Sequence, residues 1–255
     1  MIFVLEASLG FIVFLFGASI GSFASAFIFR YERHLSIVKG RSFCPICNTT
    51  LKWYDLIPVF SFLFLKRKCR YCNASIPSEG FFMELGLGAL AVILFFSYNM
   101  GYYSFLIFFI LGVLLCIFII DYRTMEIPYS LNISLFLLGI IDGFISPDIT
   151  WLERGIGLFV VSLPLLILAL IIKDSFGGGD IFLMASSGVL LGYKLLIFAF
   201  FVGLVVGGIQ GVYLLLTKKK GKKEHFAFGP ALTIGIAISM FFGDNIVSWY
   251  LGLMA

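Results

Sequence analysis

The chain has 255 residues, of which 61% are hydrophobic and only 13% are charged. Soluble domains carry about 25% charged and about 45–50% apolar residues, so this composition excludes an ordinary soluble domain and indicates a membrane protein. The formal net charge is +4. Because the cations follow the membrane topology described below, this charge does not predict nucleic-acid binding.

Eight apolar segments approach or reach the roughly 20 mostly apolar residues that a spanning helix needs. The first is predicted to be a retained helix and not a signal peptide, because no Lys or Arg precedes Arg30. The sixth is short, and we place its boundary with the seventh at Tyr193 and Lys194. The segments cover residues 5–29, 80–98, 103–121, 127–145, 154–172, 180–193, 195–216 and 229–251.

The distribution of Lys and Arg predicts the orientation of these segments. The loop 30–79 holds nine of the eighteen cations and the loop 217–228 holds five more, and Arg123 and Lys173 lie on the same side. Two cations, Arg154 and Lys194, fall on the other side. Because cytoplasmic loops carry an excess of Lys and Arg, both termini are predicted to lie outside the cytoplasm. The loop cations are interpreted as topology determinants that contact anionic lipid.

Four cysteines stand out in the loop 30–79. Two Cys-x-x-Cys pairs are separated by 21 residues and comprise Cys44, Cys47, Cys69 and Cys72. This pattern is typical of a structural zinc site with four thiolate ligands. A cytoplasmic loop keeps its thiols reduced, so disulfides are the weaker interpretation. A loop of about 50 residues buries little core, and a metal would supply part of its folding energy. Cys116, inside the third segment, is interpreted as a packing residue.

Asp121 ends the third segment, in "CIFIIDYRTMEIPYS", at the predicted cytoplasmic side. Pro128 is expected to open the next helix, and Ile127 before it to be extended. Asp180 follows three glycines in "KDSFGGGDIFLMA" and begins the sixth segment on the same side. The glycines are expected to allow unusual backbone conformations and a close approach to the chain.

Two acids, 59 residues apart, are thus predicted at one depth on one membrane face. Ionisable groups in membranes are costly and mark functional sites. Two close carboxylates cannot easily both ionise, so a pair shares a proton and can act as base and acid, as in aspartic proteases. The alternative is that each aspartate caps a helix terminus, for which Asp180 is well placed.

Several motifs together resemble the type IV prepilin peptidases, a family of membrane aspartyl proteases of the Gly-x-Gly-Asp type. The aspartate motifs are "DYRTMEIP" (121–128) and "GGGD" (177–180). The other motifs that carry the resemblance are "GSFASAFIFR" (21–30), "SFCPIC" (42–47), "YDLIPVFSFL" (54–63), "KCRYCNASI" (68–76) and "FGPAL" (228–232). The sequence departs from the family pattern at Ser25, where an Asn is usual, and at Phe182, where a Lys is frequent.

The resemblance implies that Asp121 and Asp180 are the catalytic pair and that the four cysteines form the family's tetracysteine motif. It implies cleavage of a short basic leader from type IV prepilins or pseudopilins at the cytoplasmic face of the inner membrane. It also implies methylation of the new N-terminus by S-adenosylmethionine, although no Gly-x-Gly-x-x-Gly loop assigns residues to that cofactor. Glu84 matches an acidic position of the family, and with Glu79 and Glu126 it is a candidate to attract the leader.

The predicted fold class is therefore an all-α polytopic membrane protein with about eight transmembrane helices and a small zinc-binding cytoplasmic loop. We expect a first transmembrane helix (1–29), a four-cysteine domain (30–79) and a transmembrane aspartyl peptidase core (80–255). The rival functions are an ion-coupled transporter, a zinc-loop scaffold with capping aspartates, and a peptidase without methyltransferase activity. A transporter would place its acids near the midplane of the membrane, whereas both aspartates fall at the edge.

Overall fold

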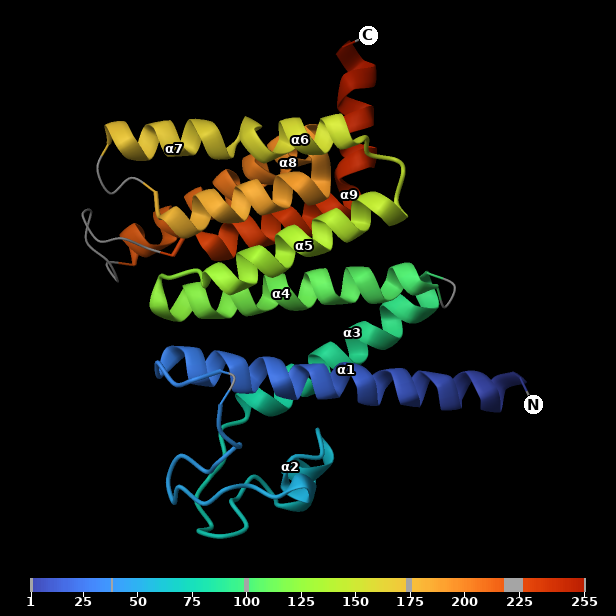
Figure 1. Cartoon of the computed structure of the whole chain (residues 1–255), viewed down its shortest axis with the longest axis vertical. Helices are drawn as coiled ribbons and strands as arrows, with labels where there is room; N and C mark the ends of the chain where they lie inside the picture. Colours follow the sequence, from blue (N-terminus) through green and yellow to red (C-terminus); the bar gives the residue numbers. More distant parts are fainter. Residues whose placement is uncertain (1, 38, 99–100, 173–175, 218–226, 255) are drawn as a thin grey trace. The chain divides into compact units, whose positions relative to one another are not determined.

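The computed structural model describes residues 2–37, 39–98, 101–172, 176–217 and 227–254. In this part of the chain the regular elements are helices, and two isolated antiparallel bridges lie in the cysteine loop (Figure 1). The predicted all-α membrane fold is confirmed. Six described helical stretches are long and apolar enough to cross a membrane: Val4–Glu32, Glu79–Ser97, Tyr102–Thr124, Trp151–Ile171, Gly178–Leu214 and Gly229–Leu253.

The predicted segments all have helical counterparts, although three of them differ from the prediction. The fifth segment is two helices, α6 and α7, and the sixth and seventh form one long element, α8. The number of membrane crossings and the side of each terminus stay predictions. The helices are α1 (Ile2–Glu32), α2 (Phe60–Phe64), α3 (Glu79–Ser97), α4 (Tyr102–Thr124), α5 (Tyr129–Ile145), α6 (Trp151–Val160), α7 (Ser162–Ile171), α8 (Gly178–Leu216) and α9 (Gly229–Met254), with a 3-10 turn at Trp53–Asp55.

The interruption between α6 and α7 has a cause in the sequence. Pro164 has no backbone N–H to donate to the carbonyl of Val160, and its ring would crowd that carbonyl in a continuous helix. The first helix accordingly ends at Val160 and the second begins at Ser162. The Ser162 hydroxyl instead donates a hydrogen bond to the carbonyl of Leu158.

Helix α8 reverses direction at Gly192, where φ is +68°. Its first half runs beside α5, because the side chain of Asn132 reaches Gly179 and Gly139 lies against Leu190. Its second half runs antiparallel to α9, as Figure 1 also shows. The predicted boundary at Tyr193 and Lys194 is therefore correct to within one or two residues. One contact between them is the hydrogen bond that Ser239 Oγ donates to the carbonyl of Leu195, at 2.8 Å.

Arg154 supports this reversal from α6. Its guanidinium donates to the carbonyls of Val189 (2.8 Å) and Leu190 (3.0 Å), which end the first half of α8. It also pairs with Asp142 of α5 at 2.8 Å, and both side chains are buried. The sequence had indicated Arg154 as a loop cation and had left Asp142 without a role. The structure instead makes them one buried ion pair, which is favourable only because the guanidinium has several further acceptors.

Contacts divide the chain into two compact units, Met1–Phe108 and Phe109–Ala255. In the first unit, α1 and α3 pack backbone to backbone. A Cβ at Gly17 would lie 2.6 Å from the carbonyl oxygen of Leu87, and one at Gly21 would lie 2.7 Å from Cα of Glu84. Small residues allow this close approach of two apolar helices. Lys173, the five lysines of the loop 217–228 and the neighbouring His225 lie outside the described residues.

Candidate active site and metal centre

Both Cys-x-x-Cys pairs in the first unit fold into the same tight turn. In the first turn Cys44 N–H donates to the carbonyl of Thr49 and Asn48 N–H donates to that of Cys44; the second repeats these bonds with Cys69, Ala74 and Asn73. Asn48 and Asn73 both have positive φ, of +55° and +57°. Asparagine tolerates this left-handed conformation better than most residues, so its position directly after each pair favours the turn.

The four thiols of Cys44, Cys47, Cys69 and Cys72 all lie within 4.8 Å of one another. The Sγ atoms of Cys44 and Cys72 are 3.9 Å apart. Tetrahedral zinc with Zn–S bonds of about 2.3 Å separates its sulfurs by roughly 3.8 Å, so the donor set fits such an ion. All four cysteines are free thiols and not disulfides. The structure therefore brings together the four residues that the sequence predicted as ligands.

The charges within this cluster also favour a cation. Hydrogen bonds from Thr49 lower the pKa of the Cys47 thiol to about 6. A backbone hydrogen bond from Ala74 favours the Cys72 thiolate, but burial and the neighbouring sulfurs outweigh it and raise the pKa of Cys72 to about 12. Four thiolates cannot form side by side without a compensating charge. A divalent metal ion supplies that charge and deprotonates the ligands that bind it.

Asp55, in the segment between the two cysteine turns, binds residues of the second turn. The sequence had not indicated this role. Its buried carboxylate accepts hydrogen bonds from Arg70 Nε (2.8 Å), Tyr71 Oη (2.9 Å) and the N–H of Lys52 (3.2 Å). Burial alone would raise the pKa of Asp55, but the hydrogen bonds from Tyr71, Arg70 and Lys52 outweigh it and lower that pKa. The available signal in the sequence was an acid in the same loop as the Arg-Tyr pair between Cys69 and Cys72.

Glu84 also has a structural partner. Its Oε2 atom accepts a hydrogen bond of 2.7 Å from the N–H of Val59, in the cysteine loop. Val59 has a φ of +64°, which is unusual for a β-branched residue. The bond thus holds an irregular part of the loop against α3, and this side chain has a role other than attracting a substrate.

The second unit contains the two aspartates. Asp121 lies in the last turn of α4, 4% exposed, and its Oδ2 accepts a hydrogen bond of 2.9 Å from the N–H of Gly229, the first residue of α9. Asp180 lies in the first turn of α8, half-buried, and accepts a backbone hydrogen bond from Gly177. Asp121 thus meets the start of α9, and Asp180 follows Gly179 at the start of α8.

Ile127 lies between the start of α8, which carries Asp180, and the start of α9, which binds Asp121. A Cβ at Gly179 would be 2.9 Å from Cβ of Ile127, and one at Gly229 would be 3.1 Å from its Cδ1. The close approach predicted for the glycines is therefore found at Gly179. The unusual backbone conformation predicted for the three glycines before Asp180 is not found, because the described glycines with positive φ are Gly40 and Gly192. Gly179 provides space and does not provide a left-handed turn.

Asn132 of α5 supports the same helix start and was missed in the sequence. It is fully buried, and its Nδ2 donates a hydrogen bond of 3.2 Å to the carbonyl of Gly179, the residue before Asp180. Its Oδ1 is buried without a partner among the described residues. A single amide in a largely apolar helix was the available signal. Nearby, the exposed ring of Tyr129 meets Phe182 edge to face at 5.8 Å, so Phe182 makes this flank of the site apolar.

Asp121 and Asp180 therefore lie at the ends of α4 and α8, and the start of α9 adjoins them. The capping interpretation is also partly correct, since each carboxylate accepts a backbone N–H at a helix start. Capping alone does not require two acids whose neighbouring helix starts both pack against one residue, Ile127. Such a pair can hold one shared proton and perform acid and base steps together.

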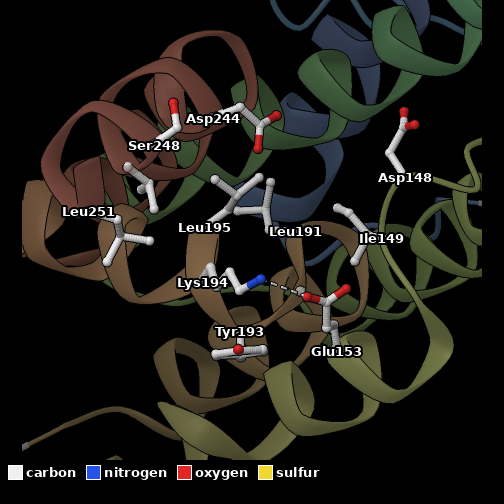
Figure 2. A pocket seen from close by; sticks show the side chains of 12 residues that line it. Asp148, Ile149, Glu153, Leu191, Tyr193, Lys194, Leu195, Asp244, Ser248 and Leu251 are labelled. Atoms are coloured by element: carbon white, nitrogen blue, oxygen red, sulfur yellow. Dashed lines mark hydrogen bonds and ion pairs between the residues drawn. The ribbon is translucent and has the colours of Figure 1, made fainter. Parts of the chain in front are cut away.

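A cavity of about 240 Å³ lies elsewhere in the second unit, at the Gly192 reversal (Figure 2). About twelve helical residues, or roughly 18 Å, separate this reversal from Asp180 along α8. Lys194 and Glu153 both line the cavity and form an ion pair, with Nζ and Oε1 3.0 Å apart. Asp148 and Asp244 also line the cavity. The cavity is thus distinct from the aspartate pair.

Comparisons with known proteins cover both units. Residues 15–98 match the bacterial peptidase A24 N-terminal domain, and residues 107–212 match the type IV leader peptidase family. A protein of Bacillus subtilis (strain 168) named prepilin leader peptidase/N-methyltransferase is 34% identical over 242 residues, which cover 94% of this chain and 97% of that protein. Proteins with the same name from Legionella pneumophila (30% identical; 88% and 82% covered) and Aeromonas salmonicida (28%; 94% and 93%) are also similar. No solved structure matches the chain.

Proposed function

The chain belongs to the type IV leader peptidase family, and from this membership and the geometry above we propose that it is a membrane-embedded aspartyl endopeptidase. Its substrates are type IV prepilins or pseudopilins, from which it removes the leader peptide. The observation that carries the proposal is that Asp121 and Asp180 lie at the ends of two apolar helices, each beside a helix start that packs against Ile127. The multi-pass chain would lie in the cytoplasmic membrane, with this site at the cytoplasmic face.

In the proposed mechanism, the two carboxylates share one proton. The ionised aspartate takes a proton from the water that attacks the scissile carbonyl, while the protonated one polarises that carbonyl. The proton taken from water then goes to the departing amine as the peptide bond breaks. The apolar segment of a prepilin stays in lipid, so its leader junction would arrive at the membrane edge. Gly178 is exposed and lies two residues before Asp180, so an extended substrate strand could approach its backbone there.

The proposal has two further parts, the methylation of the product and the binding of a zinc ion. The relatives' name supports N-methylation of the new N-terminus with S-adenosylmethionine, which would supply the methyl group. The described residues contain no glycine-rich loop between a strand and a helix that would bind such a nucleotide-like donor. For the cysteine cluster we propose one structural zinc ion, because four thiolates leave no coordination position open for a substrate.

The proposed function is tested with purified protein in detergent and a prepilin as substrate. Cleavage at the leader junction is expected, and with S-adenosylmethionine added the mature product should gain the mass of one methyl group. No cleavage by folded protein would contradict the peptidase, and a transporter predicts that result. Cleavage without any added methyl group would leave the peptidase intact and contradict only the methylation.

A further inference from the structure

Helix α2 in the cysteine loop lies beside the start of a spanning helix. The ring of Phe62 stacks on that of Phe81 of α3, with centroids 4.7 Å apart and planes 18° apart. One turn further along, Glu84 accepts the N–H of Val59, which precedes α2, at 2.7 Å. Phe81 and Glu84 are the third and sixth residues of α3, so both contacts fall within about 9 Å of its start. These contacts place α2 at the depth where α3 enters the membrane.

The outer side of α2 is apolar and open. Phe64 is 81% exposed and Leu63 is 56% exposed. At the same level of α3, Phe82 is also exposed, at 64%, and α3 is apolar enough to span a membrane. Two large side chains exposed to water would be unfavourable on a five-residue helix, whereas at this depth they would meet the boundary between headgroups and acyl chains.

A basic turn follows α2 at once. Lys66 and Arg67 have positive φ, of +49° and +63°. Backbone hydrogen bonds fold the turn back onto the helix: Lys66 N–H donates to Leu63 O at 3.1 Å, and Arg67 N–H donates to Phe62 O at 3.1 Å. All three cations, Lys66, Arg67 and Lys68, are exposed. Within the described part of the chain, none of the three pairs with a carboxylate. The turn therefore keeps three exposed cations next to Leu63 and Phe64, of which Arg67 also lies over the ring of Phe62, 5.9 Å from its centroid.

We propose that these five residues, the α2 patch, insert into the surface of the membrane that the chain spans and bind anionic lipid headgroups. Leu63 and Phe64 enter the acyl boundary, and Lys66, Arg67 and Lys68 reach the lipid phosphates. Apolar groups inserted beside cations are the arrangement by which short segments bind anionic membranes. A basic peptide, such as the leader expected of a prepilin, would face three like charges there.

The experiment uses the full chain in nanodiscs of equal amounts of phosphatidylcholine and phosphatidylglycerol. A photoreactive p-benzoylphenylalanine replaces Phe64, and illumination followed by mass spectrometry detects covalent lipid adducts. Two single replacements serve as references, each at a side chain that is 64% exposed. Phe82 lies on the spanning helix α3, and Ile46 lies in the first cysteine turn.

The proposal predicts a lipid adduct yield at position 64 comparable to that at position 82 and several-fold above that at position 46. It also predicts that phosphatidylglycerol exceeds its share of the bilayer among the adducts at 64. This excess should disappear in the variant Lys66→Gln/Arg67→Gln/Lys68→Gln. A yield at 64 an order of magnitude below that at 82, or adducts to another protein chain instead of lipid, would overturn insertion. An unchanged phosphatidylglycerol share in the triple variant would overturn the role of the cations.

Discussion

At Gly229, a methyl group in place of a hydrogen would occupy space that the Asp121 carboxylate fills. The added Cβ would lie 2.6 Å from Asp121 Oδ2 and 3.1 Å from Ile127 Cδ1. Overpacking of this kind costs about 1–3 kcal/mol, and displacement of a reacting carboxylate slows the reaction further. We expect Gly229→Ala to lower the prepilin cleavage rate by about tenfold or more.

The matched control for this variant is Gly208→Ala in α8. A Cβ at Gly208 meets nothing within 4 Å, so the rate should stay close to that of the unchanged protein. Initial cleavage rates and melting temperatures of both variants separate the two cases. If Gly229→Ala cleaves as fast as Gly208→Ala, contact with Gly229 does not position Asp121.

Asn132 offers a test of positioning around Asp180. Its replacement by Leu removes the hydrogen bond to Gly179 O but also removes the buried Oδ1 that has no partner among the described residues. Because these two effects oppose each other, stability should change by no more than about 1 kcal/mol. Cleavage should still fall by about tenfold, since the backbone before Asp180 loses its support. Ser134→Ala, on the same helix, should change neither quantity, and equal rates for the two variants would leave Asn132 a packing residue.

Among the elements, the reversal of α8 depends on the buried pair of Arg154 and Asp142. Arg154→Ala leaves a buried carboxylate unpaired and frees the carbonyls of Val189 and Leu190. Losing one partner of a buried pair costs about 3–5 kcal/mol, so the melting temperature should fall steeply. Adding Asp142→Leu should recover part of the loss.

The control for this variant is the other ion pair at the same reversal. Lys194 and Glu153 form an exposed pair at 3.0 Å, and such pairs contribute about 0–1 kcal/mol. Lys194→Met should therefore shift the melting temperature little. A similar shift for Arg154→Ala would mean that the buried pair does not hold the reversal.

The cysteine turns are a second element with a direct test. Elemental analysis of the purified chain should find about one zinc per chain, as for a four-thiolate site. Cys44→Ser/Cys47→Ser should lose the metal and loosen the loop, whereas Cys116→Ser, within α4, should retain it. Cleavage should fall less than methylation, because neither aspartate belongs to this loop. Full retention of metal by the double variant would contradict the site.

How far the sequence predicted these elements depends on the range of the interaction. Apolar runs and paired cysteines are local patterns, so the helices, the clustering of the four cysteines and the placement of both aspartates at helix ends were predictable. The reversal at Gly192 was located to within one or two residues, but its support by Arg154 was not foreseen, since the partners come from α5 and the first half of α8. Asn132 and the N–H of Gly229 contribute to the site through contacts of the folded chain that no spacing in the sequence indicates.

At the scale of the whole molecule, the proposed catalytic pair is contributed by separate parts of the chain. Asp121 comes at the end of α4 and Asp180 at the start of α8, and the start of α9 lies against Asp121. Because both acids must act in one turnover, removal of either should abolish the reaction, and removal of both should do little more.

The most direct test of this account is prepilin cleavage by Asp121→Asn, Asp180→Asn and the double variant, each purified from membranes and shown to melt as a folded protein. Asn keeps the size of the side chain and removes its ability to exchange a proton. The account predicts that all three leave the prepilin uncut to a similar extent. Substantial cleavage by a folded Asp180→Asn protein would contradict it and would leave Asp180 only the role of stabilising the start of α8.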